Sequence, residues 1–109
     1  MARISVVGAG AWGTALASHA ARLGHDVRLW AREPEVAEEV TRQHTNTPYL
    51  AGIELPPTIR AFADAGPVVA GADVVILVPP SQHLRSVAAG LARDLGAETL
   101  LVVATKGIE

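Results

Sequence analysis

Three glycines near the start of the chain have a spacing that can bring a phosphate group close to the backbone. Gly8, Gly10 and Gly13 form a G-x-G-x-x-G pattern between an apolar segment and a helix-like segment, Ala15 to Leu23. In such a context the first glycine permits a tight turn, the second lets a pyrophosphate approach, and the third lets the helix pack closely on the strand. The free N–H groups and positive dipole end of the helix would face the phosphates. The stretch predicts a dinucleotide-binding turn rather than the ordinary structural turn that glycines can also form.

A second group of candidate residues follows the second predicted strand, where a dinucleotide-binding domain selects its cofactor. Arg32 and Glu33 occupy this position. An acidic residue about 20 positions after the glycines usually holds the ribose hydroxyls, whereas a nearby arginine accommodates a 2′-phosphate. Arg32 can pair with a phosphate or stack on adenine, while Glu33 precedes Pro34 and can begin a helix. We therefore predict that Arg32 contacts the cofactor and that NADP is preferred over NAD.

Polar residues also follow two later strands. Ser81 and Gln82 come after the strand predicted at Val74–Val78, and Lys106 comes after the strand predicted at Thr99–Ala104. Ser81 and Gln82 are equally suited to capping a helix and to contacting a ligand. A single lysine is usually solvated, but at this position it could hold a phosphate or polarise a carbonyl. All three are predicted site residues.

The segment from His44 to Leu55 is irregular and contains Asn46, Pro48 and one aromatic residue, Tyr49. A loop of this length in a compact domain is often functional. Tyr49 is either a core residue or a residue that lies against the cofactor, and the sequence leaves both alternatives open.

Strands and helices alternate along the whole chain. Strands are expected at Arg3–Val7, His25–Trp30, Thr58–Phe62, Val74–Val78 and Thr99–Ala104, and helices after the glycine turn, from Pro34 to near Gln43, after Asp64, and from Ser81 to Leu95. In the first helix, apolar residues fall at helical spacing: Trp12, Leu16, Ala20 and Leu23. The alternation predicts an α/β fold, a doubly wound parallel sheet of Rossmann type with strand order 3-2-1-4-5. Ligands of such sheets bind beyond the carboxyl ends of the strands, so the glycine turn, Ser81, Gln82 and Lys106 should share one edge.

Composition excludes several classes of protein. The 109 residues form one domain, 1–109, of which 50% are hydrophobic and 18% charged, as in soluble globular proteins. A net charge of -2 without a basic cluster argues against nucleic-acid and membrane partners. The absence of cysteine excludes disulfides and sulfur-based metal sites, and we expect no other metal site. No apolar run approaches a membrane span and no signal peptide precedes the first strand, so we expect a cytoplasmic protein.

Taken together, these residues make the chain resemble the N-terminal half of bacterial NAD(P)-dependent glycerol-3-phosphate dehydrogenase over its full length. The resemblance rests on Gly8 to Ala17, Trp30-Ala31-Arg32, Asn46 to Pro56 with Tyr49-Leu50, Pro80-Ser81-Gln82 with Leu84-Arg85, and Lys106-Gly107-Ile108-Glu109. Many dehydrogenases share the glycines. The tryptophan inside the fingerprint and the serine-glutamine and lysine-glycine segments are more specific.

The resemblance implies reversible hydride transfer between NAD(P)H and dihydroxyacetone phosphate, which gives sn-glycerol 3-phosphate for phospholipid synthesis. It implies that Ala11, Trp12 and Arg32 contact the cofactor and that Lys106 contacts the nicotinamide end and the substrate. Four positions depart from the family pattern; Ala51 in place of proline and Pro79 in place of an apolar residue are tolerable in loops, and the other two bear on the cofactor. Ala11 stands where serine is common and can offer only its backbone N–H, and Glu33 stands where a basic or neutral polar residue is common, which weakens the preference for NADP.

Family members carry a further strand and a helical domain, so the fold is expected to be truncated before both. That domain contains the lysine thought to act as general acid. We therefore expect no catalytic residue in this chain, and cofactor binding without turnover. The complete enzyme would act on a small phosphorylated ketone or alcohol and is a candidate homo-oligomer, a state that the sequence leaves open. The fifth strand would then be an exposed apolar edge.

Two alternatives remain at this point. One is another two-domain dehydrogenase, such as a ketopantoate reductase or a 2-hydroxy-acid type, against which the segments 80–82 and 106–109 argue. The other is a non-catalytic NAD(P)-binding module, which the short length of the chain leaves open.

Overall fold

A computed structural model describes residues 2–78 and 99–103 of the chain. Its elements, in order, are β1 (Arg3–Val7), α1 (Ala11–Arg22), β2 (Asp26–Trp30), α2 (Pro34–Gln43), β3 (Arg60–Phe62), α3 (Ala65–Val69), β4 (Val74–Leu77) and β5 (Leu100–Val103). The helix predicted from Ser81 lies outside the described residues. Within the described ranges, every helix is too short or too polar to cross a bilayer.

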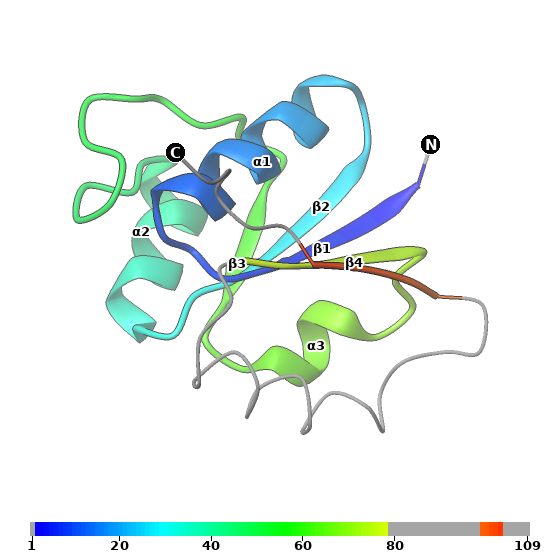
Figure 1. The fold of residues 1–109 in the computed structure, drawn as a ribbon. Helices are drawn as coiled ribbons and strands as arrows, with labels where there is room; N and C mark the ends of the chain where they lie inside the picture. The colour runs from blue at the N-terminus through cyan, green and yellow to red at the C-terminus, as the bar shows by residue number, and fades with distance from the viewer. Residues whose placement is uncertain (1, 79–98, 104–109) are drawn as a thin grey trace, which may run out of the picture.

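The five strands form one parallel sheet in the order β3-β2-β1-β4-β5. The predicted order 3-2-1-4-5 and the doubly wound architecture are therefore confirmed. α1 and α2 cover one face of the sheet and α3 covers the other (Figure 1). Val7, at the end of β1, is in register with Trp30 of β2 and with Leu77 of β4, so the carboxyl ends of the three central strands are level.

The sheet separates two clusters of buried apolar side chains. Successive residues of a strand point to opposite faces, so Val6 packs in the cluster below α1 and α2, while Val7 packs in the cluster against α3. Both side chains are fully buried. This double coverage is why β1 has an apolar sequence without the alternation of a half-exposed strand.

α1 differs from its prediction in two ways. It begins at Ala11, four residues before Ala15, and its predicted apolar stripe is only partly buried, because Trp12 is 40% exposed and Leu23 is 65% exposed. The buried face consists of small residues, namely Gly13, Thr14, Ala17, Ser18, Ala20 and Ala21. Small residues let a helix pack closely on a sheet. Of the longer apolar residues, Leu16 packs against the core cluster partly buried, while Trp12 and Leu23 are exposed.

Helix ends follow local rules that the sequence indicated. The side chain of Asp64 caps α3 by accepting a hydrogen bond from Gly66 N at 3.2 Å, as predicted. α2 begins with Glu33 at the N-cap and Pro34 at the first helical position, also as predicted. It ends at His44, whose φ of 61° is left-handed.

The outer side of β3 is occupied by a side chain of α2. The hydroxyl of Thr41 accepts a hydrogen bond from Ala61 N at 3.0 Å and lies 3.2 Å from Ala61 O, to which it can donate. The next carbonyl, Phe62 O, faces inward and accepts from Ala31 N at 2.8 Å. Thr41 therefore pairs the outward-facing peptide groups in the middle of this three-residue strand.

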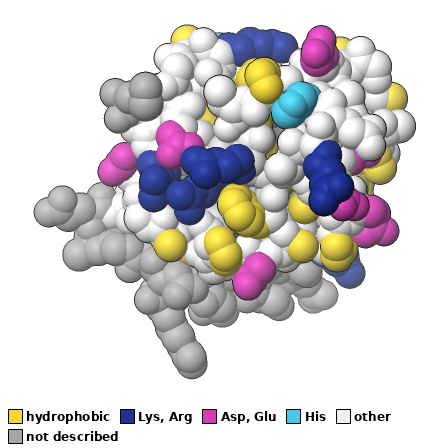
Figure 2. Space-filling view, turned by 180° about the vertical axis from the view of Figure 1, so that it is seen from behind, with side chains coloured by type: hydrophobic (Ala, Val, Ile, Leu, Met, Phe, Trp, Pro, Cys, Tyr) yellow, Lys and Arg dark blue, Asp and Glu magenta, His cyan; other side chains and the backbone are white. Residues whose placement is uncertain are grey.

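Charged side chains of both signs are interspersed on the face opposite to that of Figure 1, with apolar side chains between them (Figure 2). The carboxylate of Asp26, on β2, lies 3.3 Å from Arg3 Nε and 3.6 Å from Arg60 Nη2. These pairs are partly exposed, so each contributes at most about 1 kcal/mol to stability. The arrangement joins the amino ends of three neighbouring strands.

Candidate functional site

The three glycines of the turn have different surroundings. A Cβ at Gly8, whose φ is +126°, would lie 1.6 Å from Val78 O, and a Cβ at Gly13 would lie 1.9 Å from Gly8 O. Among the described residues, a Cβ at Gly10 would have no neighbour within 4 Å. Gly8 and Gly13 are thus required by the packing of the turn against β4 and α1, whereas Gly10 borders open space.

Gly10 is also the N-cap of α1, with extended backbone and no side-chain cap, and the first turn of the helix contains no acidic residue. The first N–H groups of a helix have no partner within it, and the helix dipole is positive at this end. Ala11 and Trp12, in the first turn, are exposed. The start of α1 therefore presents N–H groups suited to an anion.

The turn is joined directly to the end of β2. Gly8 N donates a hydrogen bond to Trp30 O at 3.2 Å. Ala31, the next residue, is fully buried, and Arg32 after it is exposed. The basic side chain predicted to select the cofactor thus follows the strand that adjoins the glycine turn.

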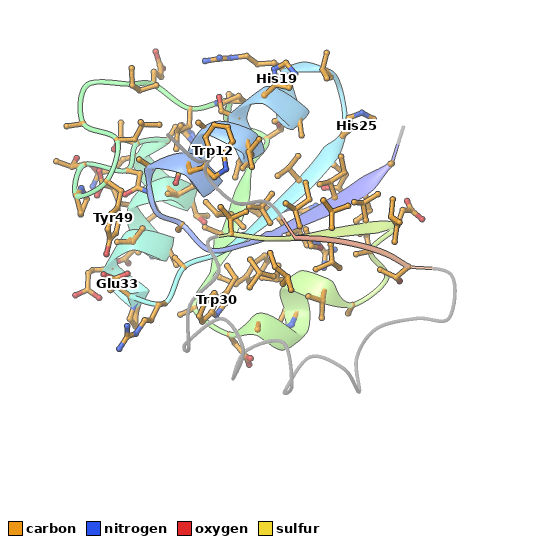
Figure 3. All side chains as sticks on the ribbon, in the orientation of Figure 1. Trp12, His19, His25, Trp30, Glu33 and Tyr49 are labelled. Carbon is orange, nitrogen blue, oxygen red and sulfur yellow. The ribbon has the colours of Figure 1, made fainter. Side chains whose placement is uncertain are left out.

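Tyr49 lies beside Glu33, on the side of the molecule where α2 begins (Figure 3). Its hydroxyl donates a hydrogen bond to Glu33 Oε2 at 2.5 Å. This bond to a carboxylate raises the pKa of Tyr49, as do desolvation and the charge of Glu33, while Arg32 lowers it. Tyr49 is 41% exposed, so the alternative of a core residue is wrong. The tyrosine remains at the surface as a neutral donor, next to the residues that follow β2.

The loop between α2 and β3 is held at two places. Glu39 of α2 accepts hydrogen bonds from Thr45 Oγ1 at 2.6 Å, Thr47 N at 2.9 Å and Thr47 Oγ1 at 2.5 Å. These bonds lower the pKa of Glu39. Asn46, between the two threonines, is fully buried and contacts the glycine turn.

The part played by Asn46 was not among the predictions from sequence. Its Nδ2 donates to Ala9 O at 2.9 Å and lies 2.8 Å from Thr14 Oγ1. These partners are 37 and 32 positions away in the chain, so no local pattern could have indicated the contact. The loop had been singled out for its length and for Tyr49.

Of the predicted site residues, Gly8 and Gly10 lie in the turn and Ala11, Trp12 and Gly13 lie in the first turn of α1. Arg32 follows the adjoining strand. Ser81, Gln82 and Lys106 lie outside the described residues.

A surface depression lies at the amino ends of the strands and is lined by Gly24, His25, Asp26, Pro57, Thr58 and Arg60. His19 and His25 lie near the carboxyl end of α1, on the same side as this depression and away from Trp12 (Figure 3). Ligands of doubly wound sheets bind at the carboxyl ends, so the glycine turn is the candidate site.

Comparison with known proteins gives a consistent result. Residues 3–109 match the family model described as the NAD-dependent glycerol-3-phosphate dehydrogenase N-terminus. The chain belongs to this family. It is 49% identical over its whole length to glycerol-3-phosphate dehydrogenase [NAD(P)+] from Paramagnetospirillum magneticum, of which it covers 39%. It is 48% identical over 98% of its length to the enzyme of that name from Nitratidesulfovibrio vulgaris, of which it covers 32%. The resemblance inferred from the sequence motifs is confirmed.

Solved structures agree with this assignment. Glycerol-3-phosphate dehydrogenase from Coxiella burnetii superposes with a TM-score of 0.87 at 34% identity, over 98% of this chain and 33% of that one. A putative ketopantoate reductase from Ralstonia solanacearum shares the fold at a lower TM-score of 0.73, with 33% identity over 99% of this chain and 33% of that one. The chain spans between about a third and two-fifths of the length of the relatives it matches.

Proposed function

We propose that this chain binds NAD or NADP as the cofactor half of a glycerol-3-phosphate dehydrogenase. The complete enzyme would transfer a hydride between NAD(P)H and dihydroxyacetone phosphate to give sn-glycerol 3-phosphate for phospholipid synthesis. One observation carries this proposal. Gly10 borders open space at the start of α1, whereas its two partner glycines are packed against backbone. A turn made only for folding would have no need of a glycine at this position, because its φ of -68° is available to any residue.

The proposed roles follow the course of the turn. The N–H groups at Gly10 and Ala11 bind the pyrophosphate, and the exposed indole of Trp12 lies beside it. Arg32 contacts the adenosine end, with Tyr49 close to it. Ser81 and Gln82 would extend the site, and the ammonium of Lys106 would hold the nicotinamide end and the substrate. The general acid would be a lysine of the helical domain.

The proposed cofactor preference is NADP, because Arg32 can pair with a 2′-phosphate. Glu33 is the opposing influence, since a carboxylate close to the ribose favours hydroxyls over a phosphate. Its bond to Tyr49 occupies one oxygen of that carboxylate, which supports the assignment of Arg32 as the residue that decides. We further propose that 1–109 is the cofactor domain of a two-domain cytoplasmic enzyme acting on a small phosphorylated ketone or alcohol.

The test is calorimetric titration of the chain with NADH and NADPH, using Gly10→Ala and a matched control, Gly66→Ala. A Cβ at Gly66 would make only an ordinary contact, 3.7 Å from Asp64 Oδ1, in the short helix α3. In Gly10→Ala the methyl group would keep the pyrophosphate from approaching the backbone N–H groups. We expect the affinity for both cofactors to fall by about tenfold or more, the cost of a lost charge-assisted hydrogen bond, with an unchanged melting temperature. Gly66→Ala should bind as the parent chain does.

Two results would contradict the proposal. The first is that the parent chain binds neither cofactor at millimolar concentration. The second is that Gly10→Ala binds both cofactors as tightly as Gly66→Ala does.

A further inference from the structure

Asn46 hydrogen-bonds to the glycine turn through its side-chain nitrogen, while its Oδ1 is buried without a hydrogen-bond partner among the described residues. Its Nδ2 lies 2.9 Å from Ala9 O and 2.8 Å from Thr14 Oγ1, and the threonine hydroxyl itself donates to Ala9 O at 3.1 Å. Asn46 and Thr14 are both fully buried, and Ala9 is 7% exposed. The carbonyl between the first two glycines thus receives two hydrogen bonds from the interior of the domain.

The orientation of the Asn46 amide follows from its partners. A backbone carbonyl can only accept a hydrogen bond, so the atom of Asn46 that faces Ala9 O must be the nitrogen. The opposite orientation would bring two oxygens to 2.9 Å without a proton between them. The amide supplies one hydrogen to Ala9 O and its other hydrogen to Thr14 Oγ1.

This contact determines where the next N–H group points. In a trans peptide the C=O of one residue and the N–H of the following residue point in opposite directions. Because Ala9 O points into the domain towards Asn46 and Thr14, Gly10 N–H points away from them. Gly10 is the residue that borders open space, so its N–H is directed towards the proposed position of the pyrophosphate.

The same residue also carries the turn that contains Tyr49. The backbone oxygen of Asn46 accepts hydrogen bonds from Leu50 N at 2.7 Å and Tyr49 N at 3.3 Å. Asn46 therefore links the turn that faces the phosphates with the turn that carries the tyrosine.

We infer that Asn46 is a positioning residue, which holds the Ala9–Gly10 peptide so that Gly10 N–H is directed at the diphosphate of the cofactor. The inference rests on the proposed function for the identity of the ligand. The orientation of the peptide is independent of it.

The test is the isosteric variant Asn46→Asp, which replaces the donor by a carboxylate and repels Ala9 O when ionised. We expect the affinities for NAD⁺ and NADP⁺ to fall together by about tenfold or more at neutral pH. Burial raises the pKa of such a carboxyl. Once protonated at lower pH it can donate again, so the ratio of variant to parent affinity should recover. The ionisable side chains nearest to Asn46 in the loop, those of Glu39 and His44, are the same in both proteins, so the ratio cancels their effect.

Two further variants control for stability. Val68→Ala removes buried volume on the opposite face of the sheet and should lower stability while leaving cofactor affinity intact. Thr14→Val retains the shape of the threonine but removes one donor to Ala9 O, so a smaller loss of affinity is expected. Thr14→Val decides the question if Asn46→Asp fails to fold.

The inference is wrong if Asn46→Asp binds both cofactors like the parent chain across the pH range. It is equally wrong if Val68→Ala, at the same stability as Asn46→Asp, loses as much cofactor affinity as that variant does. It is also wrong if Thr14→Val loses no cofactor affinity. Should the parent chain bind neither cofactor, the proposed function fails, but the inference is still tested by nuclear magnetic resonance without ligand. The Gly10 amide shift in Asn46→Asp must then follow the titration of the carboxyl and return to the parent position in acid. An amide shift that does not respond overturns it.

Discussion

Alanine at Gly8 or Gly13 would place a methyl carbon 1.6 Å from Val78 O or 1.9 Å from Gly8 O, distances that require the backbone to shift. We expect either substitution to lower the free energy of unfolding by about 4 kcal/mol or more, the range of severe packing and strain defects. Urea denaturation measures this loss. The control Gly66→Ala should stay within about 0.5 kcal/mol of the parent. A stable Gly8→Ala variant would show that the backbone at Val78, directly after β4, can move to make room for the methyl group.

Arg32 is the residue proposed to determine whether NADP or NAD is preferred. Arg32→Ala should weaken NADPH by about tenfold, because a charge-assisted bond to the 2′-phosphate is lost, and should weaken NADH much less. Parallel titrations with the two cofactors measure the difference. Arg22→Ala is the control, because Arg22 is exposed at the other end of α1. This variant should leave the affinities for NADH and NADPH unchanged. Equal losses for NADH and NADPH would remove Arg32 from the role of selecting the cofactor.

Among the elements, the loop after α2 is held at one of its two attachment points by a single carboxylate, that of Glu39. Three hydrogen bonds from Thr45 and Thr47 lower the pKa of Glu39 from its ordinary value of 4.5. A group whose pKa is lower in the folded state contributes stability above its unfolded pKa, and this contribution is lost as the pH falls through the folded value. We expect the attachment of the loop to weaken below about pH 4.5.

The comparison of the parent chain with Glu39→Gln isolates this effect. At neutral pH the variant should show faster hydrogen exchange at Thr47 N, and the difference should shrink as the parent carboxylate is protonated. Glu38→Gln is the matched control, because the Glu38 carboxylate pairs with Arg42 at the surface. A difference that persists unchanged into acid would show that Glu39 acts through something other than its charge.

Much of the arrangement of elements could be predicted from the sequence, because it depends on local signals. Apolar strands, glycine turns and caps such as Asp64 are determined by residues close in the chain, and the parallel order follows from their alternation. The buried face of α1 was harder to predict from the sequence, because the distance between helix and sheet determines whether a side chain as large as Trp12 or as small as Ala17 fits between them. The bonds of Asn46 and Tyr49 could not be predicted, since each joins residues from separate loops and helices.

For the molecule as a whole, the two edges of the sheet differ. Among the described strands, β5 is the terminal one on one side, where Leu100 is 59% exposed and Val102 is 36% exposed. Apolar edge strands pair with other chains. We expect the chain to associate in a concentration-dependent manner, and Leu100→Lys to reduce the association. Sedimentation velocity over a range of concentrations measures this, and Ile53→Lys, an exposed apolar residue of the loop, is the control. If both variants associate like the parent chain, β5 is not the contact.

The hydrogen bonds between the Thr41 hydroxyl and the backbone of Ala61 limit how far such assemblies can grow. A filament needs two free edges on each subunit, one to join the preceding copy and one to receive the next. With the middle of β3 already paired by Thr41, β5 is the one edge left unpaired in the part of the chain that the structure describes, and association should stop at the dimer. Thr41→Ala should release the second edge and convert dimers into larger, open-ended species that scatter light and bind amyloid dyes. If Thr41→Ala still stops at the dimer, the short length of β3 is the barrier and the threonine is dispensable.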